Sequence, residues 1–342
     1  MKPMTKNVVL VGDALRVLRR LPAGLVDSVV TSPPYFRLRD YGQPGQLGLE
    51  QHIDQWVEHL VAVLGEVARV MVPTGTVWLN VADSYSRNGR SGAAPKSLLL
   101  GPERLAVALV AGGWVVRNVV IWAKPNPMPA SVSDRLTASH ERLLLLTRAR
   151  HYWFDLDAVR EPHRSRRRPS RSRPIDTRPP AWAGPLAGAQ HGLARMHGHG
   201  VAGHCLGKNP GDVWTLPAGR GRGDHHAVFP EGLIRRPILA GTPERVCVAC
   251  HRGWERTRAT NQDSKLRPGC TCSAGWRPGI VLDPFIGSGT TGVVAEALGR
   301  DWLGIELHPG FAALASRHIR ERRAERQHRQ GLTTAAAGGR PP

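Results

Sequence analysis

Residues 280–291 read IVLDPFIGSGTT, a short apolar run that ends in Asp283 and continues into a turn with Gly287 and Gly289. A short apolar run between turn signals is typical of a strand buried in a parallel sheet, and residues 291–298 are typical of the helix that follows such a turn. Glycines in the turn let the backbone approach a ligand closely. The stretch therefore predicts a strand, a turn and a helix, with a ligand at the turn.

A second acidic residue favours a nucleoside as that ligand. The next apolar run, 302–305, ends at Glu306, which lies 23 residues beyond Asp283. An acid at this position suits hydrogen bonding to the hydroxyls of a ribose. The turn lacks the Gly-Lys-Ser/Thr signature of a phosphate-binding loop. Asp13, directly after the apolar run 8–11, offers a third contact, to an adenine, although a simple turn is the alternative for each of these glycine segments.

The rest of the chain alternates β-rich runs with amphipathic helices. Residues 53–71 carry apolar side chains at helical spacing and predict one packed helix. This alternation is typical of a mainly parallel sheet covered on both faces, so the fold class we predict is α/β, a doubly wound, Rossmann-like sheet. The other expected strands are 8–11, 28–30, 76–81, 115–122 and 143–147, and a further helix is expected at 103–111.

The expected strand 28–30 runs directly into residues 31–35, TSPPY. Polar groups there lie at the carboxyl edge of the sheet, where open α/β sheets bind ligands. The prolines fix φ near −65° and remove two backbone donors. Ser32 Oγ and the Pro33 carbonyl are therefore available to accept hydrogen bonds from an amine, and Tyr35 can stack on a base that has left the duplex. The expected catalytic residues are Ser32, Pro33, Pro34 and Tyr35, and a rigid turn is the alternative interpretation of this segment.

The charge balance is typical of a nucleic-acid-binding protein. The chain of 342 residues carries a formal net charge of +20, with 47 lysines and arginines of which only six are lysine. A basic composition predicts nucleic-acid binding, with a GC-rich genome as the alternative source of the arginines. No run approaches the roughly 18 apolar residues of a membrane span, and the N-terminus lacks the apolar stretch of a signal peptide. We therefore expect a cytoplasmic protein that binds double-stranded DNA and no membrane.

Four of the five cysteines form two short pairs, which does not suit a disulfide framework in a chain of this size. Two thiolate knuckles match a closed tetrahedral zinc site, and reduced, unligated cysteines are the alternative. The expected zinc ligands are Cys247, Cys250, Cys270 and Cys272. Their place in the chain predicts an inserted knob over 245–276 that is structural or contacts DNA, and we expect the fifth cysteine, Cys205, to be inert.

Two motifs together resemble those of DNA amino-methyltransferases. Residues 31–35, TSPPY, resemble the catalytic motif and residues 283–291, DPFIGSGTT, the cofactor motif, in the order of the β group, where the catalytic motif comes first. Residues 118–154, with IWAKPN and ERLLL, and 227–234, AVFPEGLI, resemble further blocks of that family. The resemblance covers most of the chain outside 161–224, the place where this group keeps its target-recognition region.

The resemblance implies S-adenosylmethionine as cofactor, with Phe285, Gly287 and Gly289 at its methionine end, Glu306 at the ribose and Asp13 at the adenine. Asp283 is also expected to face this cofactor. The reaction implied is site-specific methyl transfer to the exocyclic amine of a flipped DNA base. Cytosine N4 is favoured because adenine-specific relatives usually carry Asp or Asn where this chain has Ser32, and adenine N6 is the alternative.

Two other functions fit the sequence less well. A zinc-containing DNA-binding protein with a vestigial methyltransferase core is disfavoured by the intact site residues, and a protein-glutamine methyltransferase would carry the cofactor motif first. No Pro-Cys nucleophile occurs, which argues against methylation of a ring carbon. A cognate restriction nuclease is a candidate partner.

The expected domain organisation follows from these motifs and from composition. Residues 161–224 are rich in Arg, Pro and Gly, which predicts a partly disordered insertion, and we expect its arginine runs 164–173 and 220–222 to neutralise DNA phosphates. The expected parts are a catalytic half at 1–160, the recognition insertion at 161–224, a cofactor half with the zinc knob at 225–319 and a disordered tail at 320–342.

Overall fold

The computed structural model describes residues 6–163, 204–219, 229–257 and 264–337. They belong to two units, the larger formed by 1–155, 211–255 and 268–342 and the smaller by 156–210 and 256–267. Within the smaller unit, η1 (Asp157–Val159) is a single 3₁₀ turn, and Glu161 pairs with Lys208. The arginine runs 164–173 and 220–222, expected to contact DNA, lie outside the described residues.

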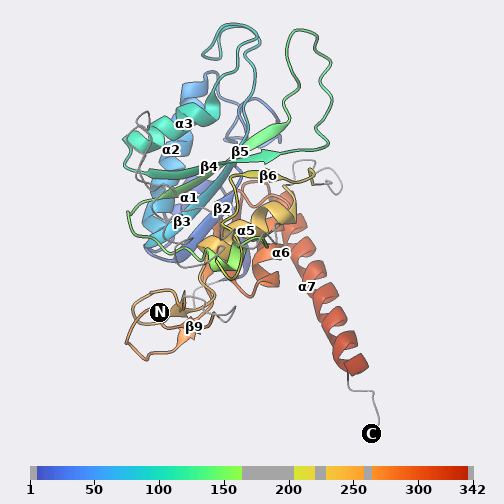
Figure 1. The fold of residues 1–342 in the computed structure, drawn as a ribbon. Coiled ribbons are helices and arrows are strands. Elements are labelled where there is room, and N and C mark those ends of the chain that lie inside the picture. Colours follow the sequence, from blue (N-terminus) through green and yellow to red (C-terminus); the bar gives the residue numbers. More distant parts are fainter. Residues whose placement is uncertain (1–5, 164–203, 220–228, 258–263, 338–342) are drawn as a thin grey trace, which may run out of the picture. The chain divides into compact units, whose positions relative to one another are not determined.

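The larger unit contains an eight-stranded sheet in the order β1-β12-β11-β2-β3-β5-β4-β6 (Figure 1). Neighbouring strands are parallel except at β5, which is antiparallel to both β3 and β4. This arrangement confirms the mainly parallel α/β sheet. In spatial order the strands are β1 (Val8–Val11), β12 (Asp301–Glu306), β11 (Ile280–Asp283), β2 (Val26–Thr31), β3 (Met71–Val81), β5 (His140–Thr147), β4 (Val115–Ala123) and β6 (Val213–Thr215).

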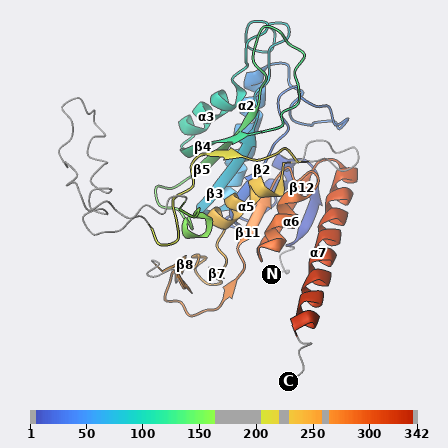
Figure 2. The same cartoon turned by 45° about the vertical axis from the view of Figure 1, so that its right-hand side comes forward.

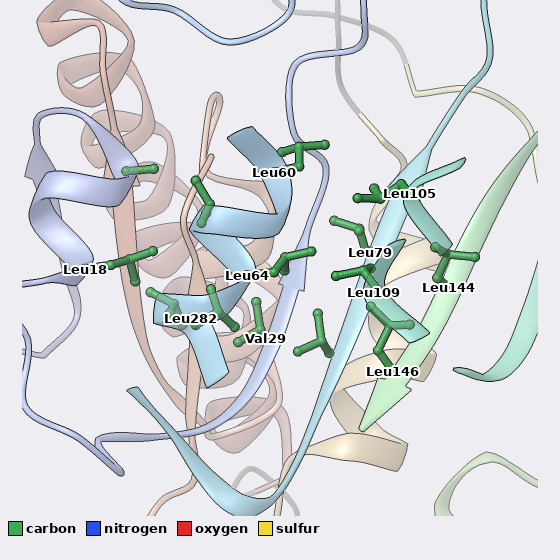
Figure 3. Close-up of a cluster of buried hydrophobic side chains, with 14 of the residues drawn as sticks. Leu18, Val29, Leu60, Leu64, Leu79, Leu105, Leu109, Leu144, Leu146 and Leu282 are labelled. Carbon is green, nitrogen blue, oxygen red and sulfur yellow. The ribbon is translucent and has the colours of Figure 1, made fainter. Parts of the chain in front are cut away.

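Helices cover both faces of this sheet (Figures 1 and 2). One face carries α1 (Ala14–Leu18), α2 (Ile53–Val70) and α3 (Gly101–Ala111), and the other α5 (Glu231–Gly241), α6 (Thr290–Ala297) and α7 (Pro309–Ala337). Figure 3 shows the core on the first face, where leucines of the helices meet apolar side chains of the strands. None of the helices in the described residues is both long enough and apolar enough to cross a membrane.

The longest helix of the first face forms where its sequence pattern predicts it. In α2, apolar residues at helical spacing are buried from Ile53 to Val70, and His52 and Gln55 form a capping box at its start. Burial of this face against the sheet supplies most of the helix's stability, because isolated helices of this length are marginal in water.

The direction of the chain reverses at the centre of the sheet. From β11 the chain passes through α6 to β12 on one side, and from β2 it passes through α2 to β3 on the other. β2 and β11 are direct neighbours, with Val281 opposite Ser28 and Leu282 opposite Val29. Ligands of open α/β sheets bind at the carboxyl ends of strands that diverge in this way. The fold therefore places a binding site at the ends of β2 and β11.

Two small ladders lie outside the main sheet. β7 (Val246–Cys247) pairs antiparallel with β10 (Trp276–Arg277), so that Cys247 lies opposite Trp276. β8 (Glu255–Arg256) and β9 (Leu266–Arg267) form the second ladder.

The expectation of a disordered tail from residue 320 is wrong for the described part of the chain, because α7 continues to Ala337. Its charged residues are bound by another helix: Arg323 and Arg326 both donate to the Glu296 carboxylate of α6. The same carboxylate accepts a hydrogen bond from Trp302 Nε1 at 3.0 Å. A sequence pattern shows a charged run here but not the partners that order it.

Replacement Glu296→Gln should lower the free energy of unfolding by about 1–3 kcal/mol, the range for hydrogen bonds to a buried charged group. The matched control is Glu325→Gln, because Glu325 pairs only with the neighbouring turn, through Arg322 at 2.9 Å, and is half exposed. An exposed pair of this kind contributes less than about 1 kcal/mol. Urea denaturation measures both variants, and equal losses would contradict the assignment of Glu296 as the tie between α6 and α7.

Candidate active site

A cavity of about 500 Å³ opens at the carboxyl edge of the sheet and brings the two predicted motifs together. This volume lies within the range of about 300–1,000 Å³ that is usual for small-molecule sites. All four residues of the expected catalytic set line it, and from the expected cofactor set the wall includes Asp13, Phe285, Gly287 and Glu306. Residues about 250 positions apart in the sequence thus share one cavity.

Asp283 does not line the cavity; it lies beneath it, with 1% of its surface exposed. Its carboxylate accepts a hydrogen bond from Thr31 Oγ1 at 2.6 Å, from Thr291 Oγ1 at 2.6 Å and from the Phe285 amide at 3.0 Å. Thr31 precedes the catalytic loop and Thr291 lies in the first turn of α6. Asp283 therefore joins the two halves of the site instead of facing a ligand.

Gly289 also lies outside the cavity wall. It caps the N-terminus of α6 with φ of 85°, a left-handed conformation that favours glycine. A Cβ at this position would lie 3.1 Å from the Ala315 carbonyl oxygen and 3.1 Å from Ile319 Cδ1, both in α7. Gly289 therefore permits the close packing of α6 on α7.

Glu306 lies at the end of β12 and lines the cavity. Its Oε2 accepts a hydrogen bond from the Gly287 amide at 3.0 Å, and its Oε1 accepts one from the His308 amide at 2.9 Å. Burial raises the pKa of this carboxyl above its ordinary value, and the two amides oppose that effect. Each oxygen keeps a further lone pair, so Glu306 can accept hydrogen bonds from a ligand.

The turn after β1 borders the same end of the cavity. Asp13 caps the N-terminus of α1 by accepting a hydrogen bond from the Arg16 amide at 2.9 Å. The Gly12 amide donates to the Glu306 carbonyl at 2.8 Å, which places the β1 turn beside the end of β12. Asp13 and Glu306 thus form one acidic wall.

The catalytic loop is held through the hydroxyl of Tyr35. This hydroxyl donates to Glu141 Oε2 at 2.6 Å and accepts from Asn80 Nδ2 at 2.6 Å and from Ser32 Oγ at 3.1 Å. Burial, together with the charge of the neighbouring Glu141 carboxylate, raises the pKa of Tyr35 well above its ordinary value. The phenol is therefore a neutral donor, and its oxygen has three hydrogen-bond partners. Next to it, the Pro34 carbonyl accepts from Trp56 Nε1 at 2.9 Å.

Three residues of this network were not among the sequence-predicted site residues, although all three line the cavity: Asn80, Lys124 and Glu141. Lys124 forms an ion pair with Glu141 Oε1, and Asn80 Nδ2 also donates to Glu141 Oε2 at 2.7 Å. Glu141 reaches the site because β5 runs antiparallel to β3, with Arg142 opposite Val81, so β5 begins where β3 ends. The available signals were a polar residue inside the apolar strand 76–81 and two charges at the ends of β4 and β5.

An aromatic group borders the cavity and was also missed by the sequence reasoning. The His308 and Phe311 rings stack with their centroids 4.4 Å apart, and Tyr41 meets Phe311 edge-on at 6.1 Å. All three residues line the cavity. They add an apolar wall beside the acidic one formed by Asp13 and Glu306.

The buried joint at Asp283 predicts a pH-dependent stability. Burial raises the pKa of this carboxyl from 3.8 to about 6, against the opposing hydrogen bonds of Thr291 and Thr31. A raised folded-state pKa contributes stability that is complete below pH 3.8 and is lost as the pH rises through about 6. The difference between the two pKa values corresponds to about 3 kcal/mol over the whole titration.

Asp283→Asn removes this titration, so its stability relative to the native protein should increase with pH. Roughly half of the 3 kcal/mol should be gained between pH 5 and pH 8. Urea denaturation of both proteins across that range measures the difference. A difference that stays constant with pH would show that Asp283 does not titrate in this way.

Comparisons with known proteins agree with the geometry of the site. Residues 26–317 match the sequence profile of the N6/N4 family described as DNA methylase. The chain is 34% identical to the Type II methyltransferase M.SmaI of Serratia marcescens over 92% of this chain and 91% of that protein, and 35% identical to M.Cfr9I of Citrobacter freundii over 89% and 84%.

Solved structures share the fold. The cytosine-N4-specific PvuII DNA methyltransferase superposes with a TM-score of 0.56 at 17% identity, over 91% of this chain and 85% of that one. TTHA0409 of Thermus thermophilus, a DNA modification methylase complexed with S-adenosyl-L-methionine, gives 0.50 at 25% identity over 91% and 94%. The family match covers both motifs that line the cavity, and the chain belongs to the DNA methylase family of N6/N4 amino-methyltransferases.

Proposed function

We propose that this protein transfers a methyl group from S-adenosylmethionine to the exocyclic N4 amine of a cytosine flipped out of DNA. The observation that carries the proposal is the single cavity in which Ser32 and Tyr35 face the same space as Phe285 and Glu306. A site for amine transfer needs an acceptor for the amine beside a nucleoside-binding wall, and this cavity has both.

The cavity wall fits the proposed cofactor. Glu306 has free lone pairs for ribose hydroxyls, Asp13 lies beside it, and Phe285 and Gly287 border the turn that follows β11. When bound, S-adenosylmethionine supplies an electrophilic methyl group on a sulfonium. The carboxylates of Asp13 and Glu306 add negative charge to a wall that would receive a cationic cofactor. Among solved relatives, the TTHA0409 complex contains this same cofactor.

The catalytic loop fits an amine. The lone pair of an exocyclic amine is delocalised into its ring, so the nitrogen becomes nucleophilic only when hydrogen bonds from its N–H groups draw it toward tetrahedral geometry. Ser32 gives its only proton to Tyr35, which leaves the Ser32 lone pairs to accept from the amine. The ring of Tyr35 lines the cavity and can contact the face of a flipped base.

The choice of base rests on Ser32. A neutral hydroxyl before Pro-Pro can accept from an amine and donate elsewhere, whereas adenine-specific relatives usually carry Asp or Asn there. Adenine N6 remains the alternative product. The relatives M.SmaI and M.Cfr9I are Type II methyltransferases, so the target is a site in duplex DNA and a cognate restriction nuclease is the partner we propose.

Mass spectrometry of nucleosides from DNA methylated by the purified protein should reveal N4-methylcytosine. N6-methyladenine in its place would reverse the choice of base and leave the amine chemistry intact, and neither product would overturn the proposed function. The matched variants are Ser32→Ala and Glu306→Ala. Calorimetry should show cofactor binding kept by the first and weakened by the second, while transfer falls in both.

We also propose that the four clustered cysteines hold a structural zinc ion. The sulfurs of Cys247, Cys250, Cys270 and Cys272 lie within 4.8 Å of one another. Four thiolates around zinc at about 2.3 Å would be spaced about 3.8 Å apart, so the cluster needs only a small contraction. Backbone amides of Cys250 and Ala249 point at the Cys247 sulfur and lower the pKa of its thiol to about 7, which suits a metal-bound thiolate.

The two cysteine pairs are also joined beside the cluster. The Arg245 guanidinium lies 4.8 Å from the Trp254 ring centroid and 4.5 Å from that of Trp276. Trp254 follows the first pair and Trp276 the second. This cation–π contact and the β7–β10 ladder hold the two knuckles together, which is the arrangement of a closed structural site and not of a reactive thiol.

Metal analysis should therefore find one zinc per chain in protein purified without chelator. Cys250→Ser and Cys272→Ser should lose the metal, and Cys205→Ser should keep it. Because structural zinc contributes directly to local folding, chelation should expose the segment 247–272 to protease before the sheet opens. Absence of stoichiometric zinc from the native protein would sink the proposal.

A further inference from the structure

Methyl transfer to an amine requires an exit for one proton. The exocyclic nitrogen begins with two N–H bonds and gains an N–C bond as the sulfonium C–S bond breaks. One N–H proton must leave for the product to be neutral and for the nitrogen lone pair to rejoin the ring. The first acceptor of this proton in the proposed function is Ser32, a hydroxyl, which cannot keep an added proton at neutral pH. Ser32 must therefore pass a proton on.

The structure contains a directed chain of hydrogen bonds from Ser32 to a carboxylate. Ser32 Oγ donates to the Tyr35 hydroxyl at 3.1 Å, and this hydroxyl donates to Glu141 Oε2 at 2.6 Å. Each hydroxyl accepts on one side and donates on the other, so one proton can be taken up at Ser32 while another is delivered at Glu141. The chain ends at the one group in it that carries a negative charge.

The surroundings of Glu141 orient this carboxylate and keep it ionised. Lys124 pairs with Oε1, which leaves Oε2 turned toward Tyr35. Asn80 Nδ2 donates to both the Tyr35 hydroxyl and Glu141 Oε2, at 2.6 Å and 2.7 Å, and so holds the two oxygens together. The Glu141 side chain is only 12% exposed, so the site is shielded from solvent. Lys124 is itself held over the Trp122 ring, 4.5 Å from its centroid.

We infer that Glu141 is the terminal proton acceptor of methyl transfer, reached from the amine through Ser32 and the Tyr35 hydroxyl. As the N–C bond forms, the amine proton moves to Ser32 Oγ, the Ser32 proton to the Tyr35 oxygen and the Tyr35 proton to Glu141 Oε2. The base ends neutral, Glu141 ends protonated, and solvent later removes that proton. Glu141 acts through Tyr35 and touches no reacting atom. This inference rests on the proposed function.

A purely structural role of Glu141 is the competing explanation, because the same contacts also fix the Tyr35 ring. Two variants separate the explanations. Tyr35→Phe keeps the ring and removes only the hydroxyl, and Glu141→Gln keeps the shape and an acceptor oxygen but removes the charge. Glu103→Gln is the matched control, because Glu103 pairs with Arg142, the next residue of β5, and does not line the cavity.

Single-turnover methylation of DNA with saturating S-adenosylmethionine gives the first readout. Glu141→Gln and Tyr35→Phe should each slow transfer by at least about 100-fold, the lower end of the usual contribution of proton transfer. The double variant should be no slower than the worse single variant, because both changes interrupt one chain. Cofactor binding by calorimetry should be unchanged, and Glu103→Gln should react at the native rate.

Rates in mixtures of light and heavy water give the second readout, which a structural role would not move. The native protein should show a solvent isotope effect with a curved proton inventory, because several protons move together, and both variants should lose it. Slow variants that keep the native isotope effect would overturn the inference, as would a native rate in either variant. If Glu141→Gln fails to fold, Tyr35→Phe decides alone. A native protein that methylates no DNA would instead refute the proposed function.

Discussion

The site depends on one buried carboxylate at the point where the chain reverses direction in the sheet. Asp283 ends β11 and is bonded to Thr31, the last residue of β2, and to Thr291, in the first turn of α6. Neither threonine can move without breaking a hydrogen bond to a charge that water does not reach, and such bonds are stronger than neutral ones. Since Thr31 is followed directly by Ser32, the position of the amine acceptor is set by the same carboxylate that sets the glycine turn. Two motifs that are remote in the sequence are thereby held in one fixed geometry.

A second buried aspartate holds the opposite ends of the same two strands. Asp27, near the start of β2, accepts from Arg277 at 2.6 Å and from the Ile280 amide at 2.8 Å. Arg277 belongs to β10, so this ion pair also joins the cysteine-bearing ladder to the central sheet. Burial raises the pKa of Asp27, and the Arg277 guanidinium opposes that effect. The central strand pair is therefore tied at both edges, once through threonines and once through an arginine, and the cysteine cluster serves the stability of the second tie and not the chemistry at the first.

Local patterns predicted most of the sheet, because burial on both faces leaves short apolar runs and polar strand ends that are visible in one dimension. Ser32 and Tyr35 follow such a strand end, and Glu306 follows another. Three features were beyond this reasoning for physical reasons. Asp283 occupies the position of a ligand-facing acid, but its side chain turns inward, and only the Thr31 and Thr291 contacts reveal this. Glu141 reaches the cavity only because β5 is antiparallel to β3, which no periodicity records. The residues of α7 beyond 320 have the pattern of a solvated charged run until Glu296, on another helix, supplies their partner.

The presence of a serine at position 32 is consistent with the network around Tyr35. An aspartate there would accept the amine proton itself and would have no hydrogen to give the Tyr35 hydroxyl, so Glu141 would be left as a second carboxylate with no part in proton movement. The two negative charges would also face each other across one phenol oxygen in a shielded site, which disfavours the ionised state of both. A serine avoids this repulsion, because it accepts and donates at the same atom and leaves the only negative charge at the far end of the chain. The neutral residue before Pro-Pro and the charged residue at the start of β5 are thus parts of one arrangement, in which the acceptor that touches the amine and the group that finally holds its proton are different residues.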